Sequence, residues 1–266
     1  MGIVIITIPG EAKRTFANSL HKKSGGKVDL VIIQKPKPRN HSIISNLKRL
    51  YNSVGLKALP IEIWYAILLR LNSSAKNTLE YFREHSLSDS SESGYLPKTM
   101  EVTSINDNDV FETLTKLSPD LMVIWGGTII KPHIIKVAKK AINLHMGFCP
   151  YYLGAIANQH AVINREPWRI GATIHYAEAK VDTGDIIEII TPNLSKPPQE
   201  LFKDLNDRAK RKYLKVAKRL YEGQILSKRP QKTKESQKLT LKEWTPRMRY
   251  RLAKQMIKWE RTGKLA

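Results

Sequence analysis

The sequence predicts an α/β fold: a mostly parallel, twisted sheet with helices on both faces, followed by a basic helical C-terminal extension. The first observation is its opening, where two short β-branched runs, residues 3–7 and 29–33, flank a helical stretch at 12–22. Such a β-α-β unit implies parallel strands buried on both faces. The second observation is the change beyond Gly223 to a Lys-, Gln-, Ser- and Pro-rich stretch and a final amphipathic helix.

A long helical insertion is expected between the second and third strands. Residues 35–40 are rich in Pro and Lys and predict a loop, and residues 43–85 then carry apolar side chains at helical spacing. Because this stretch is longer than an ordinary connection, we expect an insertion over about 41–86 that packs against the sheet, with an exposed Ser-rich loop at 86–93. The alternative is an amphipathic pair of helices that faces a partner or a membrane.

Strands and helices alternate from there to residue 221. We expect strands at 102–105, 121–125, 141–145, 171–176 and 185–190, and helices at 109–117, 132–140, 156–164 and 201–221. Thr245 and Pro246 predict the N-cap and first turn of a last helix, which ends near residue 261. The chain therefore divides into a main domain, residues 1–222, and a basic linker with an amphipathic helix, residues 223–266.

Basic residues are concentrated towards the C-terminus. The formal net charge is +21, and residues 203–266 hold 21 basic and 6 acidic residues, which is 15 of that excess. Such a field suggests a polyanionic neighbour: nucleic acid, an anionic membrane surface or a phosphorylated substrate. The alternative is a solvated basic tail, and the final helix either docks on its own domain or lies on an anionic membrane.

Composition also bears on the compartment. The sequence has no apolar run long enough to span a membrane, and its N-terminal apolar run is too short for a signal peptide. The single cysteine, Cys149, cannot form an internal disulfide and fits a reducing compartment. We therefore expect a soluble, cytoplasmic protein in which Cys149 is a packing residue, because no base is obviously paired with it.

Three polar residues on two loops carry the candidate chemistry. Asn143 and His145 share one face of a strand end because their spacing is two, and Asp182 follows the next strand. An amide N–H can donate to a developing oxyanion, an imidazole can shuttle a proton, and a carboxylate can orient the imidazole or accept a proton. The trio predicts an acyl-transfer site outside the carboxyl edge of the sheet.

Four segments in order resemble the tetrahydrofolate-dependent formyltransferases, whose shared Rossmann-like core serves glycinamide ribonucleotide, methionyl-tRNA and sugar-nucleotide amines. They are residues 120–132 (DLMVIWGGTIIKP), 142–154 (INLHMGFCPYYLG), 171–176 (GATIHY) and 181–187 (VDTGDII). Where the family usually has His-Pro-Ser-Leu-Leu-Pro, this chain has His145-Met-Gly-Phe-Cys-Pro. The departure keeps the catalytic residues and changes the acceptor side.

The resemblance implies transfer of a formyl group from 10-formyltetrahydrofolate to a primary amine. Asn143 and His145 would donate to the oxyanion, Asp182 would orient the imidazole and relay the amine proton through water, and His175 would support them. The pterin would be held by the backbone of Gly127, Thr128, Ile129, Ile130, Glu178, Ala179, Lys180 and Val181, and the acceptor by Pro9, Gly10, Gly154 and Gln159. No His or Cys spacing is typical of a metal site.

The sequence does not identify the amine that accepts the formyl group, and several classes of acceptor are considered. We expect an amino-sugar nucleotide or a related surface-polysaccharide precursor, because the residues after Gly223 show no strand alternation of the β-barrel that methionyl-tRNA formyltransferases carry. Pro9 and Glu11 disfavour the glycinamide ribonucleotide branch, since one removes an N–H and the other repels a phosphate. The alternatives are an enzyme acting on an RNA-linked amine and a non-catalytic anion-binding relative. Candidate partners are a phosphorylated small-molecule amine, an anionic membrane, nucleic acid and a second copy of the chain.

Overall fold

The computed structural model describes residues 2–35, 58–73, 94–232, 234–241 and 244–265, with a few single positions between 51 and 79. The predicted loop at 35–40, much of the helical insertion and the Ser-rich loop at 86–93 lie largely outside the described residues.

A seven-stranded sheet forms the centre of the molecule, with strand order β3-β2-β1-β4-β5-β7-β8. The strands are β1 (Ile3–Thr7), β2 (Val28–Gln34), β3 (Thr99–Val102), β4 (Leu121–Trp125), β5 (Lys140–His145), β7 (Ala172–Tyr176) and β8 (Ile186–Ile190). The first five are parallel, whereas β7 and β8 each run antiparallel to the preceding strand. All residues of β1 and β4 are buried, as expected for parallel strands covered on both faces.

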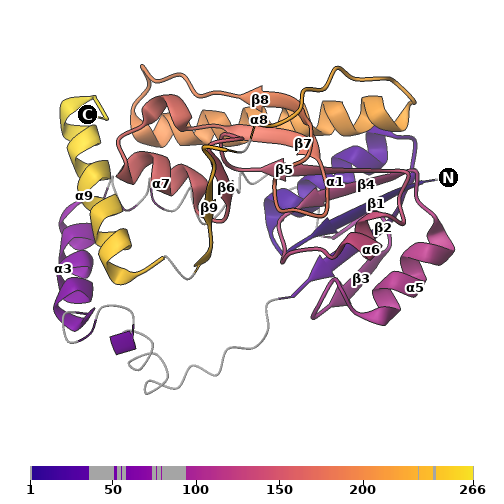
Figure 1. Cartoon of the computed structure of the whole chain (residues 1–266), viewed down its shortest axis with the longest axis horizontal. Coiled ribbons are helices and arrows are strands. Elements are labelled where there is room, and N and C mark those ends of the chain that lie inside the picture. Colours follow the sequence, from indigo (N-terminus) through magenta and orange to yellow (C-terminus); the bar gives the residue numbers. More distant parts are fainter. Residues whose placement is uncertain are drawn as a thin grey trace.

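Helices cover both faces of this sheet, which confirms the predicted fold class (Figure 1). On one face lie α1 (Glu11–Lys23) and α8 (Pro198–Tyr221), whose Phe16 and Tyr213 rings stack at 5.2 Å. The Tyr213 hydroxyl donates to the carbonyl groups of Ile124 and Ile142, so α8 is fastened to β4 and β5 beside the candidate site. On the other face, α5 (Asn108–Leu117) and α6 (Pro132–Ile135) bury Val110, Leu114 and Ile134 in a second apolar cluster.

A second group of elements lies beyond one edge of the sheet (Figure 1). It comprises α3 (Ala58–Leu71), β6 (Tyr152–Gly154), α7 (Ala157–Ile163), the 3-10 turn Pro167–Arg169, β9 (Gln237–Leu239) and α9 (Pro246–Thr262). Thr245 caps α9 by accepting from the Met248 N–H, as the sequence predicted. The apolar face of α9 is buried, and its Trp259 meets Phe202 of α8 edge to face at 6.1 Å, so this helix docks on the rest of the chain.

Several boundaries differ from the predictions. The described part of the insertion, α3, packs mainly on α9 rather than on the sheet. The third strand begins at Thr99 instead of residue 102, and the helix predicted at 132–140 ends at Ile135, because the chain turns to bring β5 alongside β4. The segment at 227–238 was predicted as a linker, but Arg229 forms a β-bridge with Ile186, and β9 pairs in parallel with β6. A three-residue strand is too short for alternation to reveal it.

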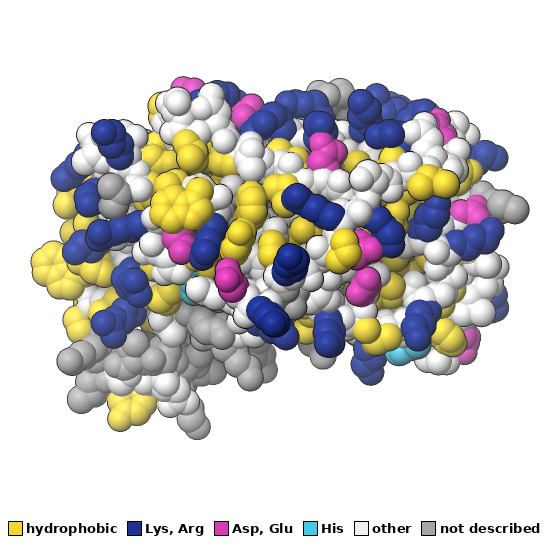
Figure 2. All heavy atoms as spheres, turned by 45° about the horizontal axis from the view of Figure 1, so that its top comes forward, with side chains coloured by type: hydrophobic (Ala, Val, Ile, Leu, Met, Phe, Trp, Pro, Cys, Tyr) yellow, Lys and Arg dark blue, Asp and Glu magenta, His cyan; other side chains and the backbone are white. Residues whose placement is uncertain are grey.

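The basic side chains do not gather in one patch on the face drawn in Figure 2, where Lys and Arg are spread among apolar and acidic side chains. None of the described helices is both long and apolar enough to cross a membrane.

Candidate active site

The antiparallel pairing of β5 and β7 places two polar side chains, Asn143 and His175, together. Along β5, Ile142 and Leu144 belong to the apolar cluster shared with α8, so the alternating Asn143 and His145 point to the opposite face. In the register with β7, Asn143 lies opposite His175. The Asn143 Nδ2 and His175 Nε2 atoms are 3.1 Å apart.

Asp182 reaches this group from the loop between β7 and β8. Asn143 Nδ2 donates to Asp182 Oδ1 at 3.1 Å, and His175 Nε2 lies 3.3 Å from the same oxygen. The second carboxylate oxygen accepts the backbone N–H of Gly154 at 2.8 Å and lies 3.3 Å from His145 Nδ1. The structure therefore brings Asn143 and His145 to the carboxylate of Asp182, the third predicted residue. It also places His175 beside the same carboxylate.

The environment of Asp182 favours its ionised form. Burial by itself raises the pKa of this carboxyl, but the neighbouring His145 and His175 and the Gly154 N–H outweigh it and hold the pKa well below its usual range. Its backbone is in the left-handed region, with φ 53°, which is uncommon for a residue other than glycine. Asp182 is 9% exposed, whereas Asn143 is half-buried, so Asn143 is the member of the trio that solvent reaches most readily.

Both ring nitrogens of His145 face acceptor groups. Nε2 lies 2.8 Å from the Tyr152 carbonyl oxygen, which requires a proton on Nε2, and Nδ1 faces the Asp182 carboxylate. The two contacts fix the orientation of the ring between the Tyr152 carbonyl and the Asp182 carboxylate. Gly147 leaves room for the ring, because a Cβ there would lie 2.2 Å from His145 Nε2 and 2.4 Å from the Ala157 Cβ.

Cys149 is buried beneath the loop that carries Asp182. Its thiol donates to the Asp182 carbonyl oxygen over 3.7 Å, and burial followed by the nearby carboxylate raises the pKa of the thiol well above its usual range. A thiol held in that form is a poor nucleophile.

The two loops expected to hold a pterin are exposed. In the first, Gln34 Oε1 accepts the Thr128 N–H at 2.8 Å, and Asn106 joins the Ile129 carbonyl to the Lys131 N–H. Residues 178–181 form the second loop. Ile130 and Ala177, one at each loop, pack against the same apolar cluster under α5.

The residues expected to bind the acceptor are dispersed. Pro9 and Gly10 are exposed at the end of β1, Gln159 is half-buried on α7, and Gly154 joins the trio through its N–H. Near Gly10, the buried Lys13 places Nζ 4.3 Å from the Trp125 ring centroid, and burial lowers the pKa of Lys13 to about 8.

Sequence reasoning missed Gln231. Its Nε2 donates to the carbonyl groups of Asp182 and Gly184 at 2.9 and 2.6 Å. No local pattern could have found this residue, because 49 positions separate it from Asp182.

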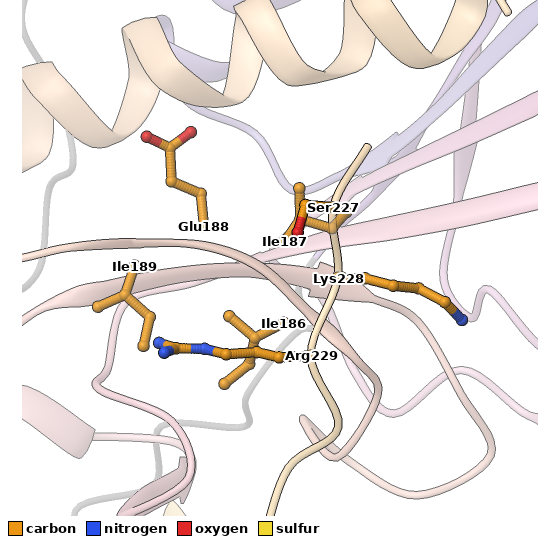
Figure 3. Close-up of a pocket in the computed structure, with 7 residues that line it drawn as sticks. All are labelled: Ile186, Ile187, Glu188, Ile189, Ser227, Lys228 and Arg229. Carbon is orange, nitrogen blue, oxygen red and sulfur yellow. The ribbon is translucent and has the colours of Figure 1, made fainter. Parts of the chain in front are cut away.

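A small cavity lies away from these residues. It has a volume of about 110 Å³ and is lined by residues 186–189 of β8 and residues 227–229, which cross beside that strand (Figure 3). Sites for small molecules commonly occupy about 300–1,000 Å³. The cavity is therefore no substitute for the polar cluster as the candidate site. Among the described residues, no group of three or more His, Cys, Asp or Glu is placed to hold a metal ion.

Comparison with known proteins gives matches in sequence and in structure. A family model described as formyl transferase matches residues 66–216. Methionyl-tRNA formyltransferase from Finegoldia magna is 34% identical over 88 residues, which are 32% of this chain and 28% of that protein. The enzyme of that name from Syntrophus aciditrophicus is 34% identical over 116 residues, or 43% and 36%. The chain thus matches about a third of the length of these curated relatives.

Solved structures resemble the chain over most of its length. A sugar N-formyltransferase from a Shewanella species has a TM-score of 0.55 at 12% identity and covers 95% of this chain and 88% of its own. An N-formyltransferase from Helicobacter canadensis, solved with folinic acid and dTDP-3-aminofucose, has a TM-score of 0.55 at 14% identity and covers 97% and 81%. At these identities the likeness establishes the fold.

Proposed function

Because the chain belongs to the formyl transferase family, we propose that it moves a formyl group from 10-formyltetrahydrofolate to the primary amine of an amino-sugar nucleotide. The observation that carries this proposal is the convergence of Asn143, His145 and His175 on the Asp182 carboxylate. An amide and an imidazole can stabilise the oxyanion of acyl transfer to an amine, and an imidazole or a carboxylate can handle its proton.

The formyl donor suits the two exposed loops. Gly127, with φ 120°, has no side chain, so backbone groups of the first loop can approach a flat ring closely. Residues 178–181 present a second exposed stretch. We infer that backbone groups of both loops hold the pterin. The bound folate supplies the formyl carbon, and its N10 atom takes up a proton as the bond from that carbon to N10 breaks.

Asn143 is the group that would hold the formyl oxygen. Its Nδ2 hydrogens now point to Asp182 and His175, so the incoming oxygen replaces one of those hydrogen bonds. As a second donor to that oxygen, His145 would exchange its Nε2 bond to the Tyr152 carbonyl for one to the formyl oxygen. Preorganised donors in a site sheltered from water stabilise a developing oxyanion.

Asp182 would fix the imidazole and help to relay, through water, the proton that the amine nitrogen loses when it bonds to the formyl carbon. The low pKa of Asp182 keeps it ionised at neutral pH, so a water molecule has to relay this proton onward to the leaving nitrogen. No proton is gained or lost overall.

Support for a sugar-nucleotide acceptor comes from the extent of the fold similarity. The Shewanella sugar N-formyltransferase matches 95% of this chain, and the Helicobacter protein was solved with a sugar nucleotide whose sugar carries an amine. An RNA-linked amine is the second candidate, on the 34% identity with methionyl-tRNA formyltransferases.

A screen of amine acceptors tests the proposal. The full chain is incubated with 10-formyltetrahydrofolate and a panel of amino-sugar nucleotides, and tetrahydrofolate release is followed. Turnover with a sugar nucleotide and none with charged initiator tRNA is expected. Turnover with the tRNA alone overturns the acceptor, and absence of turnover with every amine, with the chain folded, overturns the activity in favour of a non-catalytic relative.

A further inference from the structure

The loop that carries Asp182 turns two backbone carbonyl groups inward. Asp182 has a left-handed φ of 53°, and Gly184 is buried where a Cβ would lie 1.9 Å from the Tyr176 carbonyl oxygen. Buried carbonyl groups need a hydrogen-bond donor, and an unsatisfied one costs about 1–3 kcal/mol. This loop therefore depends on donors supplied from elsewhere in the chain, and the Cys149 thiol gives the Asp182 carbonyl only a weak one over 3.7 Å.

Gln231 supplies the N–H donors for both carbonyl groups. Its amide nitrogen carries two hydrogens and lies 2.9 Å from the Asp182 carbonyl oxygen and 2.6 Å from that of Gly184, so one hydrogen serves each. The side chain is half-buried, and its Oε1 atom is buried with no hydrogen bond in the described chain. Among the described residues, the hydrogen bonds of this amide are therefore those of its nitrogen.

The segment that bears Gln231 is held on both sides. Before it, Arg229 and Ile186 exchange two backbone hydrogen bonds at 2.8 and 3.0 Å. After it, β9 pairs with β6, and Leu239 accepts the Ala155 N–H at 3.0 Å. Gly154, whose N–H holds the Asp182 carboxylate, lies in that β6 strand. The segment consequently contacts both sides of the Asp182 loop.

We propose that Gln231 is a positioning residue that sets the location of the Asp182 carboxylate relative to Asn143 and His145, so that residues 226–239 complete the active site. The inference rests on the proposed function and extends it, because it assigns this segment a role in catalysis in place of that of a linker. Misplacement of a catalytic group by about 1 Å can lower a rate about 100-fold, so the clamp acts on turnover.

Two substitutions test the clamp. Gln231→Met keeps the length of the side chain and removes both N–H groups. Gln231→Glu places an acceptor against two carbonyl oxygens when ionised, but offers one O–H donor when protonated. Gln237→Met is the matched control, since Gln237 lies on the same segment with its side chain exposed.

The expected effect is on kcat rather than on KM. In folded Gln231→Met, kcat for formyl transfer should fall about 10- to 100-fold while KM changes less than about threefold. For Gln231→Glu, the ratio of its kcat to that of the wild type should rise as the pH falls, because protonation restores one donor. A kcat of Gln231→Met within threefold of that of the wild type, or a flat ratio for Gln231→Glu, overturns the proposal.

A second measurement separates this inference from the proposed function. The titration of the Asp182 carboxyl, followed by NMR in wild-type and Gln231→Met protein, needs no substrate. If the clamp positions Asp182, its pKa rises in the variant towards the ordinary value and stays low in Gln237→Met. If the wild type transfers no formyl group, an unchanged Asp182 titration still overturns the clamp, and a raised pKa still supports it. Should Gln231→Met not fold, the pH dependence of Gln231→Glu decides.

Discussion

Replacement of Asp182 by Asn is the most direct perturbation of the site. The carboxylate accepts the Gly154 N–H at 2.8 Å and the Asn143 amide N–H at 3.1 Å, and two imidazole nitrogens lie 3.3 Å from it. An amide of the same shape keeps one acceptor oxygen and turns an NH₂ group towards the donors that surrounded the other. Asp182→Asn therefore removes the charge and also leaves donors without an acceptor.

The two losses have different sizes. An unsatisfied buried donor costs about 1–3 kcal/mol, which for a chain of this size lowers Tm by about 2–4 °C per kcal/mol. Loss of an oriented general acid–base group lowers rates about 10²–10⁴-fold. We therefore expect Asp182→Asn to remain folded, to melt several degrees lower and to lose at least about 100-fold in kcat.

Tetrahydrofolate release at saturating substrate and thermal unfolding measure the two effects on one preparation. Asp185→Asn is the control, because Asp185 lies on the same loop but pairs with Lys228, whose side chain is 58% exposed, and such surface pairs are worth about 0–1 kcal/mol. A folded Asp182→Asn protein with kcat within fivefold of that of the wild type would refute the reasoning about the site.

Asp182 also predicts how stability depends on pH. Its folded pKa lies below the value of about 3.9 for an unfolded aspartate, so the folded state favours the carboxylate. The resulting stabilisation is fully present above about pH 4 and is lost as the pH falls through the folded pKa. Urea unfolding should therefore show a gap between wild type and Asp182→Asn that is constant from pH 7 to about 5 and narrows below 4. A gap that widens on acidification contradicts the assignment.

Three further substitutions follow from the same geometry. Asn143→Ala removes the proposed oxyanion donor and should lower kcat about 10²–10³-fold with Tm nearly unchanged, as steady-state kinetics and melting would show. Gly147→Ala puts a Cβ 2.2 Å from His145 Nε2 and should cost activity and stability together; a fully active, equally stable variant would contradict the packing. Tyr213→Phe leaves two strand carbonyls without their hydroxyl donor and should lower the free energy of unfolding by about 1–3 kcal/mol, while unchanged urea unfolding would count against that bond.

Much of the central sheet could be predicted because its signals are local. The β-branched runs at β1, β2 and β4 stand out against helical spacing, and the structure has these strands within one residue of their predicted ends. The third strand was placed three residues late, since Thr99–Val102 mixes exposed with half-buried positions and lacks a continuous apolar run.

The polar trio was predictable for a related reason. A spacing of two on a strand end puts Asn143 and His145 on one face whatever surrounds them, and the antiparallel hairpin that follows returns the chain to them. Their proposed use was less predictable, because the ring of His145 is engaged at both nitrogens by groups from other loops.

The sequence by itself determined where β5 and its two polar residues lie, since periodicity and side-chain shape act over a few neighbouring positions. Only the tertiary structure decided that Gln231 reaches the Asp182 loop and that α9 docks beside α3 and α7. Those contacts join segments far apart in the chain. They depend on which buried carbonyl groups still need a hydrogen-bond donor and which apolar helix face is still exposed to solvent. These requirements become defined only when the sheet has formed.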